Sequence, residues 1–349
     1  MTPPLVSIVI ATRNRSEDLD YTLARLRLQS YPNVEMIVID DASEESVEPV
    51  VRRHWPAANF SRKEVNVGQC QCRTEGFAVA RGKYILQLDD DASFTKSTDL
   101  EVAASCLESN VAIGLVTFYV FNGKHLPTKP LPPVEGCFVR SFLGAAALIR
   151  STVLSEVCGY QQFFGNEWEE EELSLRLIKA GYAVFFLPDV VVHHQVSPQN
   201  RRTSRTWMRG LRNKLWALTM HYPLGPLLLE SSWTVAIGTW DAIRLGRPVE
   251  LLQALFQFGA GLPRALALRH PLSKEAFRRY LAVRFMRLRT YEEFSAPHRL
   301  HYEDVRRWFT QWRNRPRQRS LWDSDEGDVG WSETVRFGHE DCVREPRSE

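Results

Sequence analysis

The chain begins by alternating short apolar runs with segments of helical periodicity. Three apolar runs, rich in β-branched and long aliphatic side chains, occupy residues 5–10, 34–39 and 84–88. Runs of this length and composition are typical of strands buried inside an α/β sheet. Between the first two runs, apolar residues recur at helical spacing at Leu19, Leu23 and Leu26. The alternation predicts right-handed β-α-β units and a mostly parallel sheet flanked by helices.

Further elements follow from the same patterns. We expect helices near residues 46–54, 70–80 and 99–109, a short strand near 60–65, and later strands at 112–119 and 188–194. An amphipathic helix is expected to begin at the four acids of residues 169–172 and to end at Gly181. These elements define one α/β domain over residues 1–200.

Carboxylates follow two of the predicted strands directly. Asp40 and Asp41 end the second run, and three consecutive aspartates, Asp89, Asp90 and Asp91, end the third. Ligands of α/β sheets gather beyond the carboxyl ends of the strands. Because strand side chains alternate between faces, Asp89 and Asp91 can point the same way and offer oxygens to Mg²⁺ or Mn²⁺. A solvated acidic turn after the third run, and an Asx turn after the second, are the alternatives.

The glycine-rich phosphate loops of other nucleotide-binding folds are absent. The chain contains neither G-x-G-x-x-G nor G-x-x-x-x-G-K-[ST]. The phosphates of a nucleotide would therefore be held in another way, and a metal ion on Asp91 would serve.

At this point a family resemblance becomes specific. The successive blocks VSIVIATRNR, VEMIVIDDAS, NVGQCQCRTEGFAVARGKYILQLDDDA and FFGNEWEEEELSLRLIKAGYAVFFLPDVVVHH resemble the family 2 glycosyltransferases, inverting enzymes of GT-A fold that use nucleotide-activated sugars. The similarity covers roughly the first 200 residues. It implies a Rossmann-like, mainly parallel sheet between helices, with the nucleotide at the carboxyl ends of the strands.

The resemblance assigns donor-binding roles to four residues. Thr12 matches the loop that touches the base and ribose, and Asp41, with Asp40 beside it, matches the base-binding aspartate. Arg73 matches a basic residue placed to reach the nucleotide or its diphosphate, where a guanidinium suits phosphate oxygens. A solvated helix arginine is the alternative for Arg73.

The resemblance also assigns the metal site. Asp89 and Asp91 match the D-x-D pair of the family, with Asp91 the direct ligand and Asp89 or Asp90 near the ribose or in the second shell of the metal. His194 matches the histidine that completes the coordination, and imidazole is an acceptable ligand of Mn²⁺. The resemblance therefore implies Mn²⁺ or Mg²⁺ as the cofactor.

The resemblance assigns four further residues to the acceptor side of the site. Gly144 matches a small-residue segment that lets the sugar approach the backbone, since glycine has no Cβ. Trp168 offers a face for sugar stacking or packs in the core. Glu169 and Glu170 occupy the place of the family's E-D pair, whose second member acts as general base. Here Glu170 is one methylene longer than the usual aspartate, so the base is Glu170 or Glu169. Acids at a helix start also complement the helix dipole, which is the alternative.

Composition narrows the class of protein. The chain has a net charge of only +2, which does not imply a nucleic-acid partner. Its six cysteines form no CxxC pair, so we expect reduced thiols in a cytosolic protein without disulfides. The amino terminus lacks the features of a secretory signal.

Beyond residue 200 the pattern changes to basic and apolar. Six basic residues occur between positions 201 and 214 with no acid among them, and a second basic stretch covers 264–289. The apolar stretches between them fall short of the ~20 residues that span a bilayer. We expect a helical region over 201–300 that lies on a membrane surface or packs on the catalytic domain or a second protomer, followed by a polar, flexible tail over 301–349.

These features predict an inverting, metal-dependent glycosyltransferase. Its expected partners are a nucleotide-sugar donor, a glycan or lipid-linked acceptor and a membrane surface, at the cytoplasmic face of the cell membrane in glycan assembly. One alternative is a sugar-phosphate nucleotidyltransferase, which the missing glycine-rich loop disfavours. The other is a catalytically inactive, nucleotide-binding assembly subunit of the membrane, which the intact D-x-D and His194 disfavour and which the change to Glu170 keeps open.

Overall fold

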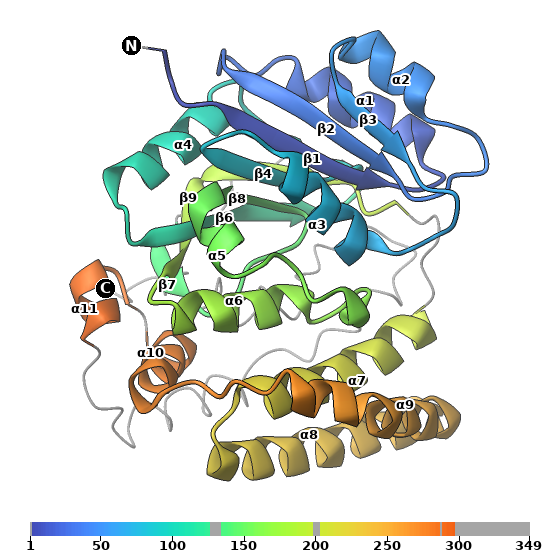
Figure 1. Ribbon diagram of the computed structural model, residues 1–349, viewed down its shortest axis with the longest axis vertical. Helices are drawn as coiled ribbons and strands as arrows, with labels where there is room; N and C mark the ends of the chain where they lie inside the picture. Colours follow the sequence, from blue (N-terminus) through green and yellow to red (C-terminus); the bar gives the residue numbers. More distant parts are fainter. Residues whose placement is uncertain (1, 126–133, 198–202, 287, 297–349) are drawn as a thin grey trace, which may run out of the picture.

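The computed structural model describes residues 2–125, 134–197, 203–286 and 288–296, and within them one sheet is flanked by helices (Figure 1). The nine strands are β1 Val6–Thr12, β2 Val34–Asp40, β3 Asn59–Arg62, β4 Tyr84–Asp89, β5 Ala92–Phe94, β6 Ile113–Asn122, β7 Cys137–Val139, β8 Ala146–Arg150 and β9 Ala183–His194. The helices of the α/β part are α1 Ser16–Leu26, α2 Glu48–His54, α3 Gln69–Val79, α4 Asp99–Ser109, α5 Ser151–Glu156 and α6 Glu169–Lys179, with a 3₁₀ turn η1 at Gln162–Phe164.

The sheet is mixed: its first four strands run parallel, and the remaining strands combine antiparallel pairs with the parallel pair of β6 and β9. Its strand order is β3-β2-β1-β4-β8-β6-β9-β5, and β7 pairs with β9 off this path. The strands β3, β2, β1 and β4 run parallel, as the sequence predicts. By contrast, β8 runs antiparallel to β4 and β6, and β5 and β7 run antiparallel to β9. The α/β class is confirmed. The sheet is mixed rather than parallel because the short strands β5, β7 and β8 run antiparallel to their neighbours.

The boundaries of the predicted elements shift by a few residues. β1, β2 and β4 coincide with the three apolar runs, whereas β3 ends at Arg62 and β9 begins at Ala183, ahead of the expected start at residue 188. The strands β5, β7 and β8 were not expected. They contain only three, three and five residues, too few for a periodic pattern to identify.

Alternation along the strands fills both faces of the sheet. On β1, Ile8 and Ile10 pack into the same apolar cluster as Leu23 of α1, while Val9 points the other way and packs with Phe77 of α3. This is the period of two expected for a strand covered on both faces. Fully burying one such side chain stabilises the fold by about 1.5–3 kcal/mol. The polar ends of these strands are thereby held in fixed positions.

The described part of the C-terminal region is helical, as predicted. It contains α7 Thr203–His221, α8 Leu224–Arg244, α9 Pro248–Ala267, α10 Lys274–Phe285 and α11 Tyr291–Ser295. Figure 1 shows α7, α8 and α9 grouped at one end of the molecule, with α6 between them and the sheet. Trp216 of α7 donates a hydrogen bond to the carbonyl of Phe258 on α9 (3.1 Å) and packs against Gly261. None of the described helices is long and apolar enough to cross a bilayer. The predicted tail over 301–349 lies outside the described residues.

The cysteines differ from expectation at one position. Cys70, Cys72, Cys106 and Cys158 are free thiols, whereas Cys137 is disulfide-bonded. The expectation of reduced thiols throughout is therefore wrong for Cys137.

Candidate active site

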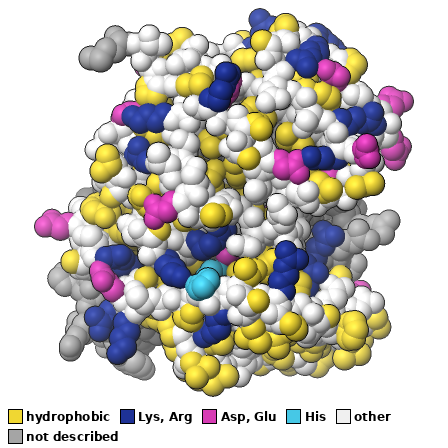
Figure 2. Space-filling model, viewed as in Figure 1, with side chains coloured by type: hydrophobic (Ala, Val, Ile, Leu, Met, Phe, Trp, Pro, Cys, Tyr) yellow, Lys and Arg dark blue, Asp and Glu magenta, His cyan; other side chains and the backbone are white. Residues whose placement is uncertain are grey.

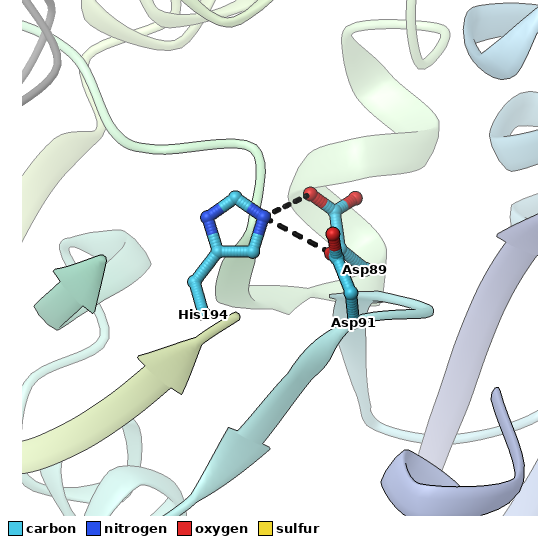
Figure 3. A group of neighbouring side chains, drawn as sticks. All are labelled: Asp89, Asp91 and His194. Atoms are coloured by element: carbon cyan, nitrogen blue, oxygen red, sulfur yellow. Dashed lines mark ion pairs between the residues drawn. The ribbon is translucent and has the colours of Figure 1, made fainter. Parts of the chain in front are cut away.

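Three ligand atoms meet where β4 and β9 end. His194 Nε2 lies 3.0 Å from Asp91 Oδ1 and 3.7 Å from Asp89 Oδ2 (Figure 3). One ligand atom from each of the three residues can be chosen so that all lie within 4.8 Å of one another. Two carboxylates and one imidazole are a donor set that suits Mn²⁺ and is acceptable for Mg²⁺. The sequence-predicted metal residues are thus brought together.

The hydrogen bonding of His194 fits a cation at this cluster. Its Nδ1 lies 2.9 Å from Asn122 Oδ1, an amide oxygen that can only accept, so Nδ1 carries the proton. Nε2 then faces two carboxylates, an arrangement that needs either a second proton on the ring or a metal ion. Burial alone would raise the pKa of Asp91, but the charges of His194 and Arg15 hold it well below its usual range. The Asp91 carboxylate is therefore ionised and can bind a cation.

Backbone pairing fixes the spacing of the ligands. Ala92 of β5, the residue after Asp91, pairs with His194 of β9. The carbonyl of Asp91 accepts a hydrogen bond from the Gln195 N–H (2.9 Å), and Asp91 Oδ2 accepts one from the Ser197 N–H (2.8 Å). The relative positions of Asp91 and His194 thus follow from strand pairing.

Asp89 is oriented by two side chains of α3. Arg73 is only 1% exposed, and it donates hydrogen bonds to Asp89 Oδ1 and to the carbonyl of Gly144 (2.9 Å). Gln69 Nε2 also donates to Asp89 Oδ1 (2.9 Å). With Oδ1 occupied in this way, Oδ2 is the oxygen that faces His194. A solvated helix arginine is therefore the wrong description of Arg73. Its burial against a carboxylate depends on tertiary packing that a helix pattern does not report.

Asp90 and Thr12 bind each other. Asp90 Oδ2 accepts a hydrogen bond from Thr12 Oγ1 (2.7 Å), and Asp90 Oδ1 accepts one from Arg15 (3.0 Å). Burial, with the negative charge of Asp91 adding to it, raises the pKa of Asp90 to about 7 although Arg15 opposes the shift. Asp90 is not one of the three ligand residues of the cluster, and its hydrogen bond with Thr12 connects the end of β1 to the end of β4. Arg15, which sequence reasoning missed, also lies 3.5 Å from Asp91.

Asp40 and Asp41 shape two turns at the end of β2. Asp40 Oδ1 accepts the Ser43 N–H (2.9 Å), which is the turn expected as the alternative. Asp41 accepts hydrogen bonds from the N–H groups of Val67 (2.7 Å) and Gly68 (3.0 Å) and from Asn66 Nδ2 (2.6 Å). Asp41 thereby connects β2 to the loop that precedes α3.

Glu170 lies beside the metal cluster, and Gly144 makes room for it. A Cβ at Gly144 would overlap Oε1 of Glu170 and crowd Nη1 of Arg73. The space expected for a sugar next to this backbone is therefore taken by Glu170 itself. Burial raises the pKa of Glu170, the charge of Arg73 lowers it, and the nearby Asp89 raises it again.

The other acids of α6 have different environments. Glu169 is 4% exposed, and its burial, with the charges of Glu170 and Glu167, raises its pKa well above the usual value. Glu171 pairs with Arg140 (3.2 Å). Glu172 is hydrogen-bonded to Arg176 (2.6 Å) and to His221 of α7 (2.8 Å). The last two acids join elements of the fold, so Glu169 and Glu170 are the candidates for chemistry.

The loop before α6 is held in an unusual conformation by α7. Glu167 and Trp168 have φ values of 73° and 68°, in the left-handed region that costs such residues about 1–3 kcal/mol. Asn213 Nδ2 donates to the carbonyls of Phe164 (3.0 Å), Asn166 (2.8 Å) and Glu167 (2.7 Å). Sequence reasoning missed Asn213, whose only signal is a polar residue at a buried position of a basic helix.

Trp168 packs in an aromatic cluster. It is partly buried and packs against the cluster that contains Phe164 and Trp216, and Lys214 Nζ is 5.3 Å from the centroid of its ring. Of the two expectations for Trp168, this position corresponds to core packing.

The model of glycosyl transferase family 2 matches residues 7–157 of this chain. It is 33% identical over 95 residues to the putative colanic acid biosynthesis glycosyl transferase WcaA of Escherichia coli, covering 26% of this chain and 34% of that protein. It is 29% identical over 140 residues to the amylovoran biosynthesis glycosyltransferase AmsB of Erwinia amylovora, covering 37% of this chain and 46% of that protein. The chain thus spans about a third to a half of the length of these relatives.

Solved structures share the fold. The mannosyltransferase PcManGT of Pyrobaculum calidifontis, in complex with GDP-Man and Mn²⁺, aligns with a TM-score of 0.53 at 17% identity, over 80% of this chain and 84% of that one. Residues 1–349 of TarS from S. aureus align with a TM-score of 0.53 at 14% identity, over 94% and 97% of the two chains. At this identity the similarity concerns the fold alone, which is that of a glycosyltransferase.

Proposed function

We propose that this chain is an inverting, metal-dependent glycosyltransferase that moves a sugar from a nucleoside-diphosphate sugar to a hydroxyl group of a glycan or lipid-linked acceptor. The observation that carries the proposal is the carboxylate of Glu170 beside the cluster of Asp89, Asp91 and His194. Relatives named for colanic acid and amylovoran biosynthesis support a polysaccharide or glycoconjugate product. The neighbour that holds GDP-Man and Mn²⁺ supports the donor class.

Asp91, Asp89 and His194 would hold a divalent cation, Mn²⁺ or Mg²⁺. When bound, such a cation neutralises the negative charge that grows on the leaving diphosphate. Arg15, 3.5 Å from Asp91, adds a positive charge to the same edge of the sheet. Gln69 and Arg73 hold Asp89 in the orientation that such a ligand needs.

Asp41 remains the proposed contact for the nucleotide base. The loop at 66–68 donates three hydrogen bonds to the Asp41 carboxylate, and the Cys72 thiol is hydrogen-bonded to it as well. A base N–H would bind this carboxylate in place of one of these donors. Thr12 and Asp40 are proposed to shape this pocket through their turns and strand ends.

Glu170 is the proposed general base. Its side chain lies at Gly144 and Arg73, next to the metal cluster, whereas Glu169 is buried away from solvent. A carboxylate with a raised pKa is a stronger proton acceptor than an ordinary one. In the reaction, the acceptor oxygen bonds to the anomeric carbon while the bond from that carbon to the diphosphate oxygen breaks. Glu170 takes the hydroxyl proton, and the diphosphate leaves with the electron pair.

Donor turnover by the purified chain tests this proposal. UDP-, dTDP- and GDP-sugars are screened with Mn²⁺ or Mg²⁺ for release of nucleoside diphosphate, with and without a lipid-linked glycan acceptor. We expect one donor to be turned over in the presence of metal. E170Q should retain donor binding and lose about 10²–10⁴-fold in turnover. Donor binding without turnover by the wild type would favour the inactive subunit, and absence of any donor binding would contradict both functions.

A further inference from the structure

The helices α8 and α9 present an exposed apolar surface. Of the seventeen large hydrophobic side chains that are exposed among the described residues, eleven lie between positions 224 and 266. Phe256 is 77% exposed, Leu229 76% and Trp240 66%. We define the apolar face by Leu229, Trp233 and Trp240 of α8 together with Val249, Leu252 and Phe256 of α9. Soluble monomers rarely expose so many large apolar side chains in one place, so a partner is indicated.

The apolar face is continuous along both helices. Exposed positions 229, 233, 236, 240 and 243 of α8, and 249, 252, 256 and 260 of α9, recur every three or four residues, which keeps them on one side of each helix. Figure 2 shows hydrophobic side chains gathered over the lower edge of the molecule, where Figure 1 places α8 and α9. Lys and Arg side chains lie above this edge.

The exposed stripes lack charge between their ends. Glu230, in the first half of α8, faces inward and contacts Arg284 (3.0 Å) and Lys214 (3.7 Å). The exposed charges are Arg244 at the end of α8 and Arg264 in the last turn of α9. An apolar stripe with a cationic group at its end is the pattern of helices that lie in the membrane interface.

The charge around the apolar face favours an anionic partner. Residues 203–285 contain twelve Lys or Arg and four Asp or Glu, a net charge of +8. This excess lies in α7 and in residues 269–284, on either side of α8 and α9 in the sequence, because residues 224–267 contain three basic and three acidic residues. An anionic lipid surface attracts such a segment. Tryptophan, present at positions 233 and 240, is also enriched at membrane interfaces.

We propose that the apolar face docks this protein onto an anionic membrane, with Trp233, Trp240 and Phe256 inserted among the lipid headgroups and Arg244 and Arg264 against lipid phosphates. The helices lie on the bilayer rather than cross it, in line with the finding that no described helix could span one. Docking depends on this surface alone, so it can be measured without any sugar donor.

Vesicle binding by the full chain tests the proposal. The purified protein is sedimented with vesicles of phosphatidylcholine, with or without phosphatidylglycerol, at low and high salt. We expect binding that requires phosphatidylglycerol and weakens with salt. L252Q/F256Q should lower the partition coefficient by at least about tenfold, because two inserted side chains become polar. The matched control L28Q/V111Q changes two apolar side chains that are exposed elsewhere, and it should bind like the wild type.

The depth of insertion gives a second readout. Brominated lipids quench tryptophans that enter the bilayer, so wild-type fluorescence should fall on binding. W233F/W240F keeps the apolar area and should still bind, but with most of that quenching removed.

Three results would overturn the proposal. The first is failure of the full chain to bind phosphatidylglycerol vesicles. The second is an equal loss of binding in L28Q/V111Q. The third is an analytical ultracentrifugation result in which a wild-type dimer, unable to bind vesicles, becomes a monomer in L252Q/F256Q, which would assign the apolar face to a second copy.

Discussion

At the scale of single residues, the candidate site depends on side chains that touch the predicted ligands. Gln69 and Arg73 occupy one oxygen of Asp89 and leave the other for His194. Supporting contacts of this kind tune metal affinity because they orient a ligand before the metal arrives.

We therefore expect Gln69→Ala to weaken Mn²⁺ binding by about tenfold, at the lower end of the range for such contacts because Arg73 remains. Isothermal titration with Mn²⁺ measures the effect. Gln71→Ala on the same helix is the control, since Gln71 contacts Glu75 and not the cluster. Equal affinities for the two variants would show that Gln69 does not orient Asp89.

Gly144→Ala should displace the carboxylate of Glu170, because the added Cβ overlaps Oε1. Glu170 is flexible at that end, so the fold should survive while turnover falls by about 10²-fold, the cost of a misplacement near 1 Å. Donor release assays measure this. The double variant G144A/E170D shortens the acid by one methylene and should recover part of the activity. No recovery, or no loss in Gly144→Ala, would argue against Glu170 as the base.

At the scale of elements, α7 supports α6, the helix that begins with Glu169 and Glu170, at two points. Asn213 binds three carbonyls of the loop before α6, and His221 binds Glu172 within α6. The C-terminal helices are therefore part of the site's framework, although they contribute no proposed ligand.

Asn213→Ala should destabilise the protein and the loop together. It removes a donor from the carbonyls of Asn166 and Glu167, at about 1–3 kcal/mol each if no water replaces it. The carbonyl of Phe164 keeps its hydrogen bonds from Arg212 and from the Asn166 N–H. We expect urea unfolding to show a loss of a few kcal/mol and turnover to fall while Mn²⁺ affinity is kept. Asn213→Asp, of equal size but without donors, should be at least as damaging. A milder effect of Asn213→Asp than of Asn213→Ala would mean that packing, not hydrogen bonding, is what counts.

The contact between Glu172 and its partners predicts a pH-dependent stability. Burial would raise the pKa of Glu172, but Arg176 and His221 hold it at about 2. Because the pKa is lowered on folding, the stabilisation is complete above the unfolded value near 4.3 and is lost as pH falls toward 2. It amounts to about 3 kcal/mol. Urea unfolding of the wild type and E172Q should differ most above pH 5 and converge in acid. A constant difference would contradict the assignment.

Sequence and structure agree where the pattern is local. The three apolar runs correspond to β1, β2 and β4. They correctly predicted that Asp41, Asp89 and Asp91 lie at the edge of the sheet where these strands end. The pattern could not show that Arg73 reaches Gly144, 71 positions away. It also could not show that Gly144 faces Glu170, since both contacts form only when folding brings distant segments of the chain together. The role of Asn213 could not be predicted for the same reason, because the sequence of its helix shows only a basic pattern.

At the scale of the whole molecule, metal binding should stabilise the folded state. The cluster brings together ligands far apart in the sequence, so the unfolded chain offers no equivalent site. Mn²⁺ at one hundred times its dissociation constant should add about 2.7 kcal/mol to the free energy of unfolding. Denaturation with and without Mn²⁺ measures this, and Asp91→Asn should remove the increment. Equal stabilisation of the variant would place the ion elsewhere.

The pairing of β5 with β9 has a consequence for how a metal ion binds and dissociates. Because Ala92 and His194 are neighbours in the sheet, Asp91 and His194 are positioned during folding and the ion need not assemble them. The conformational entropy of bringing these ligands together is lost before the ion arrives. Loading should therefore proceed as fast as the ion sheds its water, and a chelator should strip it reversibly while the sheet stays intact.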